Sequence, residues 1–232
     1  MTKQSTYRKC EIVDLGLVSY KETWDLQKDT LQRRLKGELP DTFYLLEHPH
    51  TYTLGKTADG KNLLFNKSEL EKKGITVFEI DRGGDITYHG PGQIVGYPII
   101  NLKEWKLDTH LYLRSLEEVL IRTCNDYGLD AGRAEGLTGV WIDNRKIAAI
   151  GIKISRWITM HGFAFNVNTN LDLFQGIIPC GITDKKVTSL KEELGNEHNL
   201  NEVHEKILKH FKDIFEYDEI IAKKKDSLSV SI

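Results

Sequence analysis

The sequence lacks the features that mark membrane-spanning, secreted and nucleic-acid-binding proteins. Its 232 residues include only three cysteines, five prolines and two methionines, and no apolar run approaches the ~18 residues needed to span a bilayer. Lys and Arg number 32 against 34 Asp and Glu, giving a net charge of −2 without the basic excess of a typical nucleic-acid binder. We therefore expect no membrane span and no nucleic-acid partner.

The cysteines and histidines also exclude several classes of site. Cys10, Cys124 and Cys180 form no CxxC pair, and such a sparse, odd set is typical of free thiols in a reducing compartment. His48 and His50 flank a proline without the spacing of zinc ligands. The amino terminus shows no apolar core of a targeting peptide. We expect a cytoplasmic protein that needs no metal and no cofactor.

What is present is a strand-rich chain flanked by amphipathic helices. Strands are predicted at residues 10–16 (an edge strand), 42–47, 75–80, 93–102, 139–155 (a hairpin around Asp143-Asn144) and 158–168. Helices are predicted after Ser19, after Asp108 and after Asn199. No linker or repeat divides the chain. The prediction is one domain over residues 1–232, with a mobile tail from about residue 222, and an α/β (α+β) fold in which helices pack on a mixed sheet.

One cysteine stands in an unusual context. Cys10 alternates with Ile12 on a predicted strand and Cys124 lies on the apolar stripe of a helix, so both are expected in the core. Cys180 lies outside any strand or helix period, between Pro179 and Gly181, which can hold a thiol at the lip of a cavity. From these residues alone, Cys180 is either a nucleophile or a buried loop thiol.

A glycine-rich segment and a lysine are further candidates. Residues 82–93, RGGDITYHGPGQ, allow backbone amides to approach a bound group closely, although a tight hairpin explains the same glycines. Arg82 is able to contact a polar or anionic group. His89 is either a general base or a hydrogen-bonded part of the wall. Lys146 enters an apolar run, Ile147–Ile152, where it is either partly desolvated with a lowered pKa or an ordinary surface lysine.

Three segments together resemble the lipoyl(octanoyl) transferase family. They are RGGDITYHGPGQIVGYPIINL (82–102), GVWIDNRKIAAIGIKISRWITMHGFAFNVN (139–168) and GIIPCGITDKKVTSL (176–190), in the family's order. The resemblance implies the fold of biotin and lipoate protein ligases, with Cys180 as acyl-thioester nucleophile and Lys146 as the group that lowers its pKa and transfers protons. It maps the substrate pocket to Arg82, Gly83, Gly84, Asp85, Ile86, Thr87, Tyr88, His89, Ala149, Ile150, Gly151, Gly162, Phe163 and Ala164.

The resemblance also implies partners and a reaction. Octanoyl-acyl carrier protein would be the donor, and the acceptor would be a lysine of a lipoyl-domain protein, such as a 2-oxoacid dehydrogenase subunit or the glycine cleavage H protein. The family is commonly monomeric. We expect Gly151 and Gly162 to leave space for the acyl chain. Residues 50–65 are less typical of the family.

Three rival interpretations remain. An ATP-dependent lipoate or biotin ligase on the same fold would need a nucleotide site and no cysteine nucleophile. A non-catalytic acyl-carrier- or lipoyl-binding module would not need both Cys180 and Lys146. A Cys–His hydrolase using Cys180 and His89 would release free octanoate.

Overall fold

Strands dominate the fold and helices flank them. The structure is a computed structural model that describes residues 7–178 and 186–225. Its strands are β1 (Lys9–Leu17), β2 (Asp41–Glu47), β3 (Thr51–Leu54), β4 (Thr76–Glu79), β5 (Ile86–His89), β6 (Gln93–Ile99), β7 (Val140–Ile142), β8 (Arg145–Ser155), β9 (Ile158–Asn166), β10 (Lys186–Val187) and β11 (Glu219–Lys223). Its helices are α1 (Tyr20–Leu35), α2 (Lys67–Lys72), α3 (Thr109–Asn125), α4 (Leu190–Leu194) and α5 (Leu200–Ile214), with 3₁₀ turns η1 (Gly60–Asn62), η2 (Leu102–Glu104) and η3 (Leu171–Gly176).

The larger sheet is mixed, as predicted. Within the described residues its strand order is β10-β8-β9-β6-β2-β1-β11, with β7 paired to β8. The pairs β1–β2, β1–β11 and β8–β10 are parallel, and the central pairs of β2, β6, β9 and β8 are antiparallel. A smaller sheet, β4-β3-β5, lies beside it. This combination confirms the predicted α/β fold class.

The end of the chain corrects two predictions about the sheet. Residues 10–16 were predicted as an edge strand, but β1 lies inside the sheet because β11 pairs with its outer side, with Cys10 opposite Ile220. Residues 222 and 223, assigned by the sequence to a tail, complete β11. A strand of five residues with a mixed exposed pattern carries too little periodicity to be recognised from sequence.

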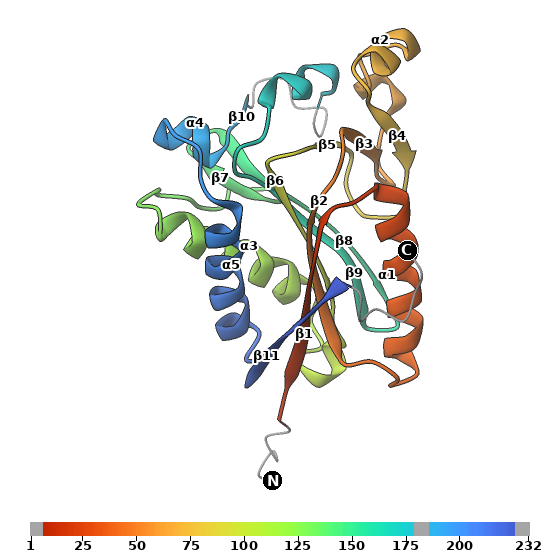
Figure 1. Cartoon of the computed structure of the whole chain (residues 1–232), viewed down its shortest axis with the longest axis vertical. Helices are drawn as coiled ribbons and strands as arrows, with labels where there is room; N and C mark the ends of the chain where they lie inside the picture. The colour runs from red at the N-terminus through yellow and green to blue at the C-terminus, as the bar shows by residue number, and fades with distance from the viewer. Residues whose placement is uncertain (1–6, 179–185, 226–232) are drawn as a thin grey trace.

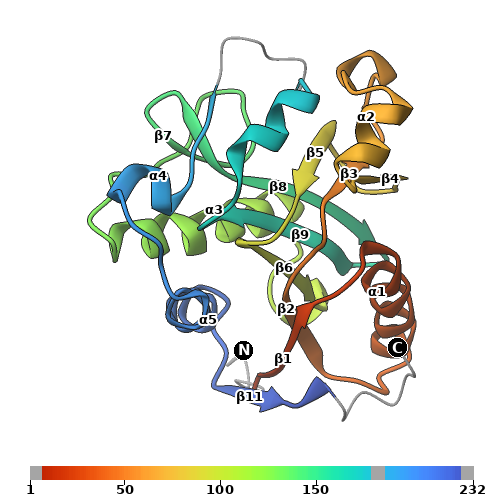
Figure 2. The same ribbon diagram turned by 45° about the horizontal axis from the view of Figure 1, so that its top comes forward.

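Helices cover both faces of the larger sheet. Figures 1 and 2 both show α1 on one face and α3 with α5 on the other. The predicted caps are in place: Ser19, Asp108 and Asn199 accept backbone N–H groups at the starts of α1, α3 and α5. Cys10 on β1 and Cys124 on α3 are both fully buried in the core cluster that the inner faces of α3 and α5 complete, which confirms their predicted packing role.

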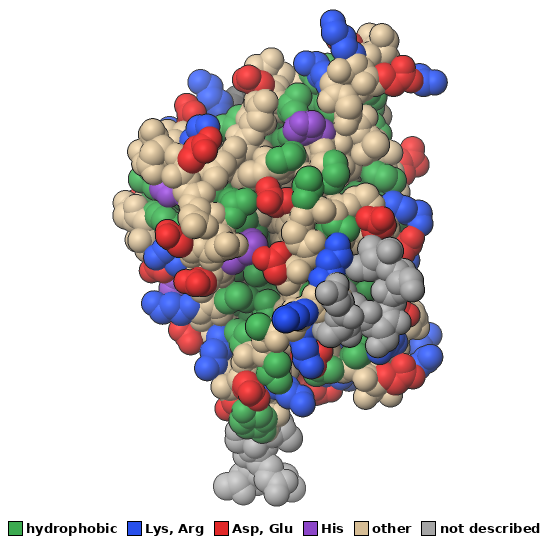
Figure 3. Space-filling view, viewed as in Figure 1, with side chains coloured by type: hydrophobic (Ala, Val, Ile, Leu, Met, Phe, Trp, Pro, Cys, Tyr) green, Lys and Arg blue, Asp and Glu red, His purple; other side chains and the backbone are tan. Residues whose placement is uncertain are grey.

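The surface carries mixed charge. On the face in Figure 3, acidic and basic side chains are interspersed with apolar and polar ones. In the described parts of the chain, no helix has both the length and the apolar character to cross a bilayer.

Candidate active site

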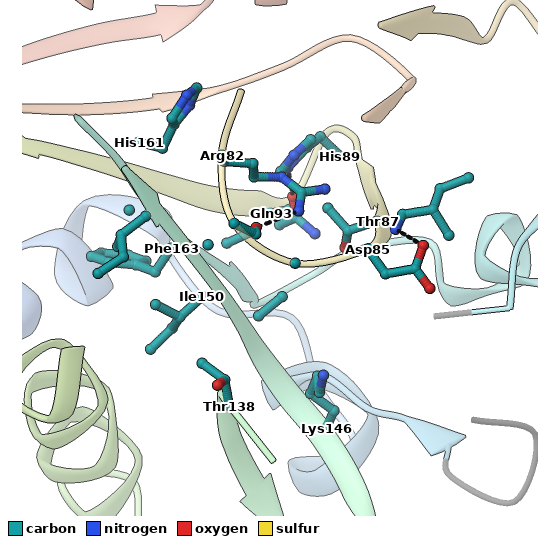
Figure 4. Close-up of a pocket in the computed structure, with 18 of the residues that line it drawn as sticks. Arg82, Asp85, Thr87, His89, Gln93, Thr138, Lys146, Ile150, His161 and Phe163 are labelled. Carbon is teal, nitrogen blue, oxygen red and sulfur yellow. Dashed lines mark hydrogen bonds between the residues drawn. The ribbon is translucent and has the colours of Figure 1, made fainter. Parts of the chain in front are cut away.

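A cavity of about 420 Å³ lies where the glycine-rich loop before β5 meets strands β8 and β9. Its size falls within the roughly 300–1,000 Å³ typical of small-molecule sites. Figure 4 shows the loop of Arg82 crossing β8, with Lys146 and Thr138 on one side of the loop and His89 on the other. The cavity therefore joins segments that are far apart in the sequence.

Most of the residues mapped by the resemblance come together here. The cavity is lined by Lys146 and by the mapped positions Arg82, Gly83, Gly84, Asp85, Ile86, Thr87, His89, Ala149, Ile150, Gly151, Gly162, Phe163 and Ala164. Tyr88 is not among the residues that line it. Cys180 lies outside the described residues, in the stretch 179–185.

Strand register brings two of the mapped segments face to face. In the antiparallel pair β8–β9, Ala149 lies opposite Ala164, Ile150 opposite Phe163 and Gly151 opposite Gly162. Directly opposed residues share a face of the sheet. The register therefore brings residues 149–151 and 162–164 side by side at the cavity, with the pair Ile150 and Phe163 on the opposite face from the two flanking pairs.

The two glycines in this patch do not leave open space, which corrects that expectation. A Cβ atom at Gly151 would lie 2.8 Å from Cδ of Arg82 and 2.9 Å from the carbonyl oxygen of Gly83. At Gly162 it would lie 2.1 Å from the carbonyl oxygen of Gly96. These glycines allow a loop and a neighbouring strand to approach β8 and β9 closely.

Tyr88 faces away because side chains alternate along β5. Thr87 and His89 line the cavity, while Tyr88 is fully buried beside Tyr52 in a cluster of which Ile86 and Phe174 also reach the cavity. Its hydroxyl lies 2.8 Å from Nδ1 of His50. The packing role of Tyr88 is therefore to support the strand from behind.

One part of the cavity, which we call the polar end, consists of Arg82, His89, Gln93, Tyr97 and His161. The Arg82 guanidinium donates to the carbonyl oxygen of Thr53 at 2.8 Å, to its Oγ1 at 2.9 Å and to the Gly83 carbonyl at 3.0 Å. The ring nitrogens of His89 lie 2.9 Å from Oε1 of Gln93 and 3.3 Å from Oγ1 of Thr53. Hydrogen bonds to neighbouring groups therefore hold the Arg82 and His89 side chains of the polar end in place.

This hydrogen bonding extends toward Lys146. Nε2 of Gln93 donates to Oδ1 of Asn166 at 2.9 Å, and Nδ2 of Asn166 donates to the carbonyl of Thr188 at 3.0 Å. The N–H of Thr188 in turn donates to the carbonyl of Lys146 at 3.0 Å. The polar end and the start of β8 are thus parts of one connected network.

The histidines near the polar end are kept neutral by burial. Desolvation lowers the pKa of His89 well below its ordinary value and that of His48, which contacts the Tyr97 hydroxyl at 2.9 Å, to about 4. Burial also lowers the pKa of His161, against the opposing effect of Asp81, whose carboxylate lies 2.9 Å from its Nε2. The His161 contact holds the pKa of Asp81 well below its usual range.

Another part of the cavity, which we call the apolar wall, consists of Leu113, Leu137, Ile150, Ile152 and Phe163. These side chains come from α3, from the loop before β7, and from β8 and β9. Ile150 and Ile152 are only partly buried, on a stretch of β8 that pairs with β9 alone among the described strands. The wall therefore offers apolar surface to a ligand.

Lys146 lies where β8 begins. Its Nζ stands 4.8 Å from the centroid of the Trp141 ring, and its backbone pairs in register with Val187 of β10. The two residues of β10 directly follow the stretch 179–185. The chain that leaves the Cys180 segment is therefore anchored beside Lys146.

Several residues that line the cavity are not anticipated from the sequence: Tyr20, Gln93, Tyr97, Leu113, Leu137, Thr138, Ile152, His161, Asn166, Phe174 and Val187. His161 adopts φ 60°, a left-handed conformation that no sequence pattern signals in a strand. Across residues 7–178 and 186–225, no group of three His, Cys, Asp or Glu side chains is arranged to hold a metal ion.

Sequence comparisons agree on one family. Residues 19–212 match the lipoyl protein ligase A/B catalytic domain. The chain is 53% identical over 226 residues to an octanoyltransferase of Christiangramia forsetii, covering 90% of this chain and 97% of that protein. It is 49% identical over 211 residues to an octanoyltransferase of Solibacter usitatus, covering 91% and 95%.

Solved structures share the fold at low sequence identity. The bipartite lipoate protein ligase of Thermoplasma acidophilum has a TM-score of 0.74 and 16% identity, covering 94% of this chain and 89% of that one. A lipoate-protein ligase A bound with ATP has a TM-score of 0.73 and 16% identity, covering 95% and 89%. These likenesses establish the fold.

Proposed function

Because this chain belongs to the lipoyl protein ligase A/B catalytic-domain family and acts as an octanoyltransferase in protein lipoylation, we propose that it carries the octanoyl group on Cys180. The donor is octanoyl-acyl carrier protein, and the acceptor is a lysine of a lipoyl-domain protein. Lys146 assists both half-reactions. The mapped cavity residues hold the acyl chain.

The observation that carries this proposal is an apolar-walled cavity with Lys146 on its lining. Burying each methylene of an acyl chain is worth roughly 0.8 kcal/mol, so an eight-carbon chain gains most of its binding energy from such a wall. Chain connectivity supports the place of the nucleophile, since Cys180 is two residues after Ile178 and six before Lys186. Lys186 is itself in register with Arg145, beside Lys146.

The first half-reaction forms the acyl-enzyme. A free cysteine with a pKa of ~8.5 is only about 3% thiolate at neutral pH, and a nearby ammonium favours the thiolate. The thiolate attacks the donor thioester carbonyl, a new C–S bond forms, and the donor's C–S bond breaks. The departing thiolate of the carrier takes the proton of the Lys146 ammonium, which leaves Lys146 neutral, and the octanoyl group stays on the enzyme.

The second half-reaction forms an amide. The acceptor lysine, with a pKa of ~10.4, must lose a proton before its nitrogen can attack the enzyme thioester. That proton leaves to solvent. As the amine attacks and the C–N bond forms, neutral Lys146 accepts the second proton of the nitrogen, and the C–S bond to Cys180 breaks. The proton taken by Lys146 balances the thiolate that is released, which restores the starting pair.

The geometry of His89 supports transfer rather than hydrolysis. A Cys–His hydrolase needs an imidazole with a nitrogen available to the thiol. Both nitrogens of His89 are occupied by Gln93 and Thr53, and burial keeps its pKa well below the ordinary value. His89 therefore acts as a hydrogen-bonded wall of the site.

Intact-mass measurement of the acyl-enzyme tests the proposal. The protein is mixed with octanoyl-acyl carrier protein, without ATP and without acceptor, and one hydroxylamine-sensitive octanoyl group is expected on the peptide of Cys180. Cys10→Ser and Cys124→Ser should still be labelled, and Cys180→Ser should not. A lipoyl domain should then discharge the label onto its lysine. Product that forms only with ATP would establish a ligase instead, and a label on another cysteine would overturn the nucleophile assignment.

A further inference from the structure

Residues 55–64 bind the glycine-rich loop along its length. The N–H groups of Gly55, Lys56 and Thr57 donate to the carbonyls of Asp85, Arg82 and Gly84 at 3.3, 3.0 and 3.2 Å. The segment that follows β3 therefore fixes the backbone of the loop that lines the cavity.

The far end of the same segment binds a different part of the chain. Leu63 forms an antiparallel bridge with Ile177, and the N–H of Leu64 donates to the carbonyl of Gly176 at 2.8 Å. The N–H of Ile178 donates to the carbonyl of Asn62 at 2.9 Å. Residues 62–64 thus hold the chain at the last described position before Cys180.

Asn62 takes part in both sets of contacts. Its Nδ2 donates to Oδ2 of Asp85 at 2.7 Å, while its carbonyl accepts the N–H of Ile178. The other carboxylate oxygen of Asp85 accepts the N–H of Ile86 at 2.7 Å, and both Asp85 and Ile86 line the cavity. A carboxylate only accepts hydrogen bonds, so the amide of Asn62 is matched to it.

We propose that Asn62 is a positioning residue that sets the acyl cavity in register with the chain leading to the nucleophile. This inference rests on the proposed function, because it concerns the alignment of an acyl group in the cavity with Cys180. Asn62 is bonded to the cavity loop through its side chain and to Ile178 through its main chain. Losing the side-chain bond leaves both parts folded but removes the direct link from residue 62 to the loop, so that only the backbone bonds of residues 55–57 still tie this segment to the loop.

The expected defect lies in the chemical step. A misplacement of about 1 Å between reacting groups can cost up to roughly 100-fold in rate. Asn62→Asp, which sets two carboxylates against each other, should therefore lower the rate of acyl-enzyme formation about ten- to hundred-fold. The KM for the acceptor domain and the thermal midpoint should change little, since Asn62 is only partly buried.

The decisive variant exchanges the two side chains. In Asn62→Asp/Asp85→Asn the amide and the carboxylate trade places, so the hydrogen bond can form again in the opposite direction. We expect this double variant to recover most of the rate lost in Asn62→Asp. Asn66→Ala is the matched control, because Asn66 caps α2 only four residues later without contacting the cavity loop, and it should keep near-wild-type activity.

Single-turnover acylation by octanoyl-acyl carrier protein, with a thermal melt for each variant, separates the outcomes. Wild-type rates in folded Asn62→Asp would overturn the inference while the proposed function stands. A loss in Asn62→Asp that the exchange does not restore would also overturn it, because the hydrogen bond would not be the cause. Absence of any acyl-enzyme in the wild-type protein would instead refute the proposed function.

Discussion

The apolar wall and the polar end of the cavity are held in place by different forces. The wall comes from strand register and packing, as in the opposed pair Ile150 and Phe163. The polar end comes from buried hydrogen bonds, such as those of Arg82 to Thr53. Trimming an apolar side chain costs energy in proportion to its area, whereas removing a buried donor leaves its acceptors unsatisfied at full cost. The wall should therefore tolerate changes that the polar end does not.

The largest effect is expected at Lys146, a charged residue on the strand that also supplies Ile150 and Ile152. Positioned proton transfer contributes roughly 10²–10⁴-fold, so Lys146→Ala should reduce acyl transfer by that order with little change in folding. Arginine should not rescue activity, because a guanidinium does not release its proton at neutral pH. Single-turnover kinetics of both half-reactions measure the effect.

Lys186→Ala is the control for Lys146, since Lys186 is exposed on the adjacent strand β10 and is not among the residues that line the cavity. It should turn over normally. Near-normal turnover in Lys146→Arg would refute the proton-transfer role and leave only a charge role.

The second effect tests the polar end through Arg82. Arg82→Met keeps the apolar stem but removes the donors to the carbonyl and hydroxyl of Thr53 and to the Gly83 carbonyl. Hydrogen bonds to a charged group contribute about 1.5–3 kcal/mol, so the free energy of unfolding should fall by about 3 kcal/mol. Urea denaturation measures it. Arg122→Met, which breaks an exposed ion pair with Glu118, should cost less than about 1 kcal/mol; equal losses would contradict the contrast.

The third effect is the pH dependence of stability that comes from His48, which contacts Tyr97 of the polar end. His48 binds protons in the unfolded chain at a pKa near ~6.5, but in the fold burial lowers its pKa to about 4. Between these values the unfolded state holds more protons than the folded state. The contribution of His48 to the free energy of unfolding is therefore fully present above about pH 6.5 and is lost as the pH drops. From pH 7 to pH 5 this group should cost about 2 kcal/mol.

Urea denaturation of the wild type and of His48→Gln at both pH values isolates this contribution. An amide can replace the contacts of His48 with the Val18 carbonyl and the Tyr97 hydroxyl without titrating. The difference in stability between pH 7 and pH 5 should be smaller in the variant. Identical pH dependence in both proteins would show that His48 is not the titrating group.

The smallest effect tests the apolar wall. Ile150→Ala removes apolar surface from a partly exposed side chain, so kcat/KM for octanoyl donors should fall roughly ten-fold, with a relative gain for decanoyl donors. Kinetics with six-, eight- and ten-carbon donors measure the shift. Ile154→Ala, on the same strand and on the same face but not lining the cavity, is the matched control. An unchanged chain-length preference in Ile150→Ala would remove Ile150 from the acyl site.

Local patterns predicted those parts of the fold that are determined locally. The hairpin around Asp143-Asn144 and the helix starts at Asp108 and Asn199 follow from turn and cap chemistry. Strand β11 and the two-residue β10 could not be predicted, because they exist through pairing with strands elsewhere in the sequence. Short strands are products of tertiary structure rather than of their own periodicity.

The site divides in a similar way. The sequence segments that resemble the family contain the glycine-rich loop, Lys146 and the opposed pairs of β8 and β9. These parts of the site could be predicted because each motif is continuous in the chain. Gln93, Asn166 and His161 have side chains whose partners come from other elements, so only the fold reveals that they are buried and bonded. The sequence suggested open space at Gly151. The close approach of Arg82 to this glycine also depends on the fold.

The pairing of β1 with β11 has a consequence for synthesis on the ribosome. Lys9 pairs with Glu219, so β1 emerges long before the strand that covers its outer edge. An unpaired strand edge is a template for association with other chains. The nascent protein therefore carries an uncovered β edge while the residues between β1 and β11 are synthesised, and a chaperone that shields this edge would protect the chain until β11 emerges.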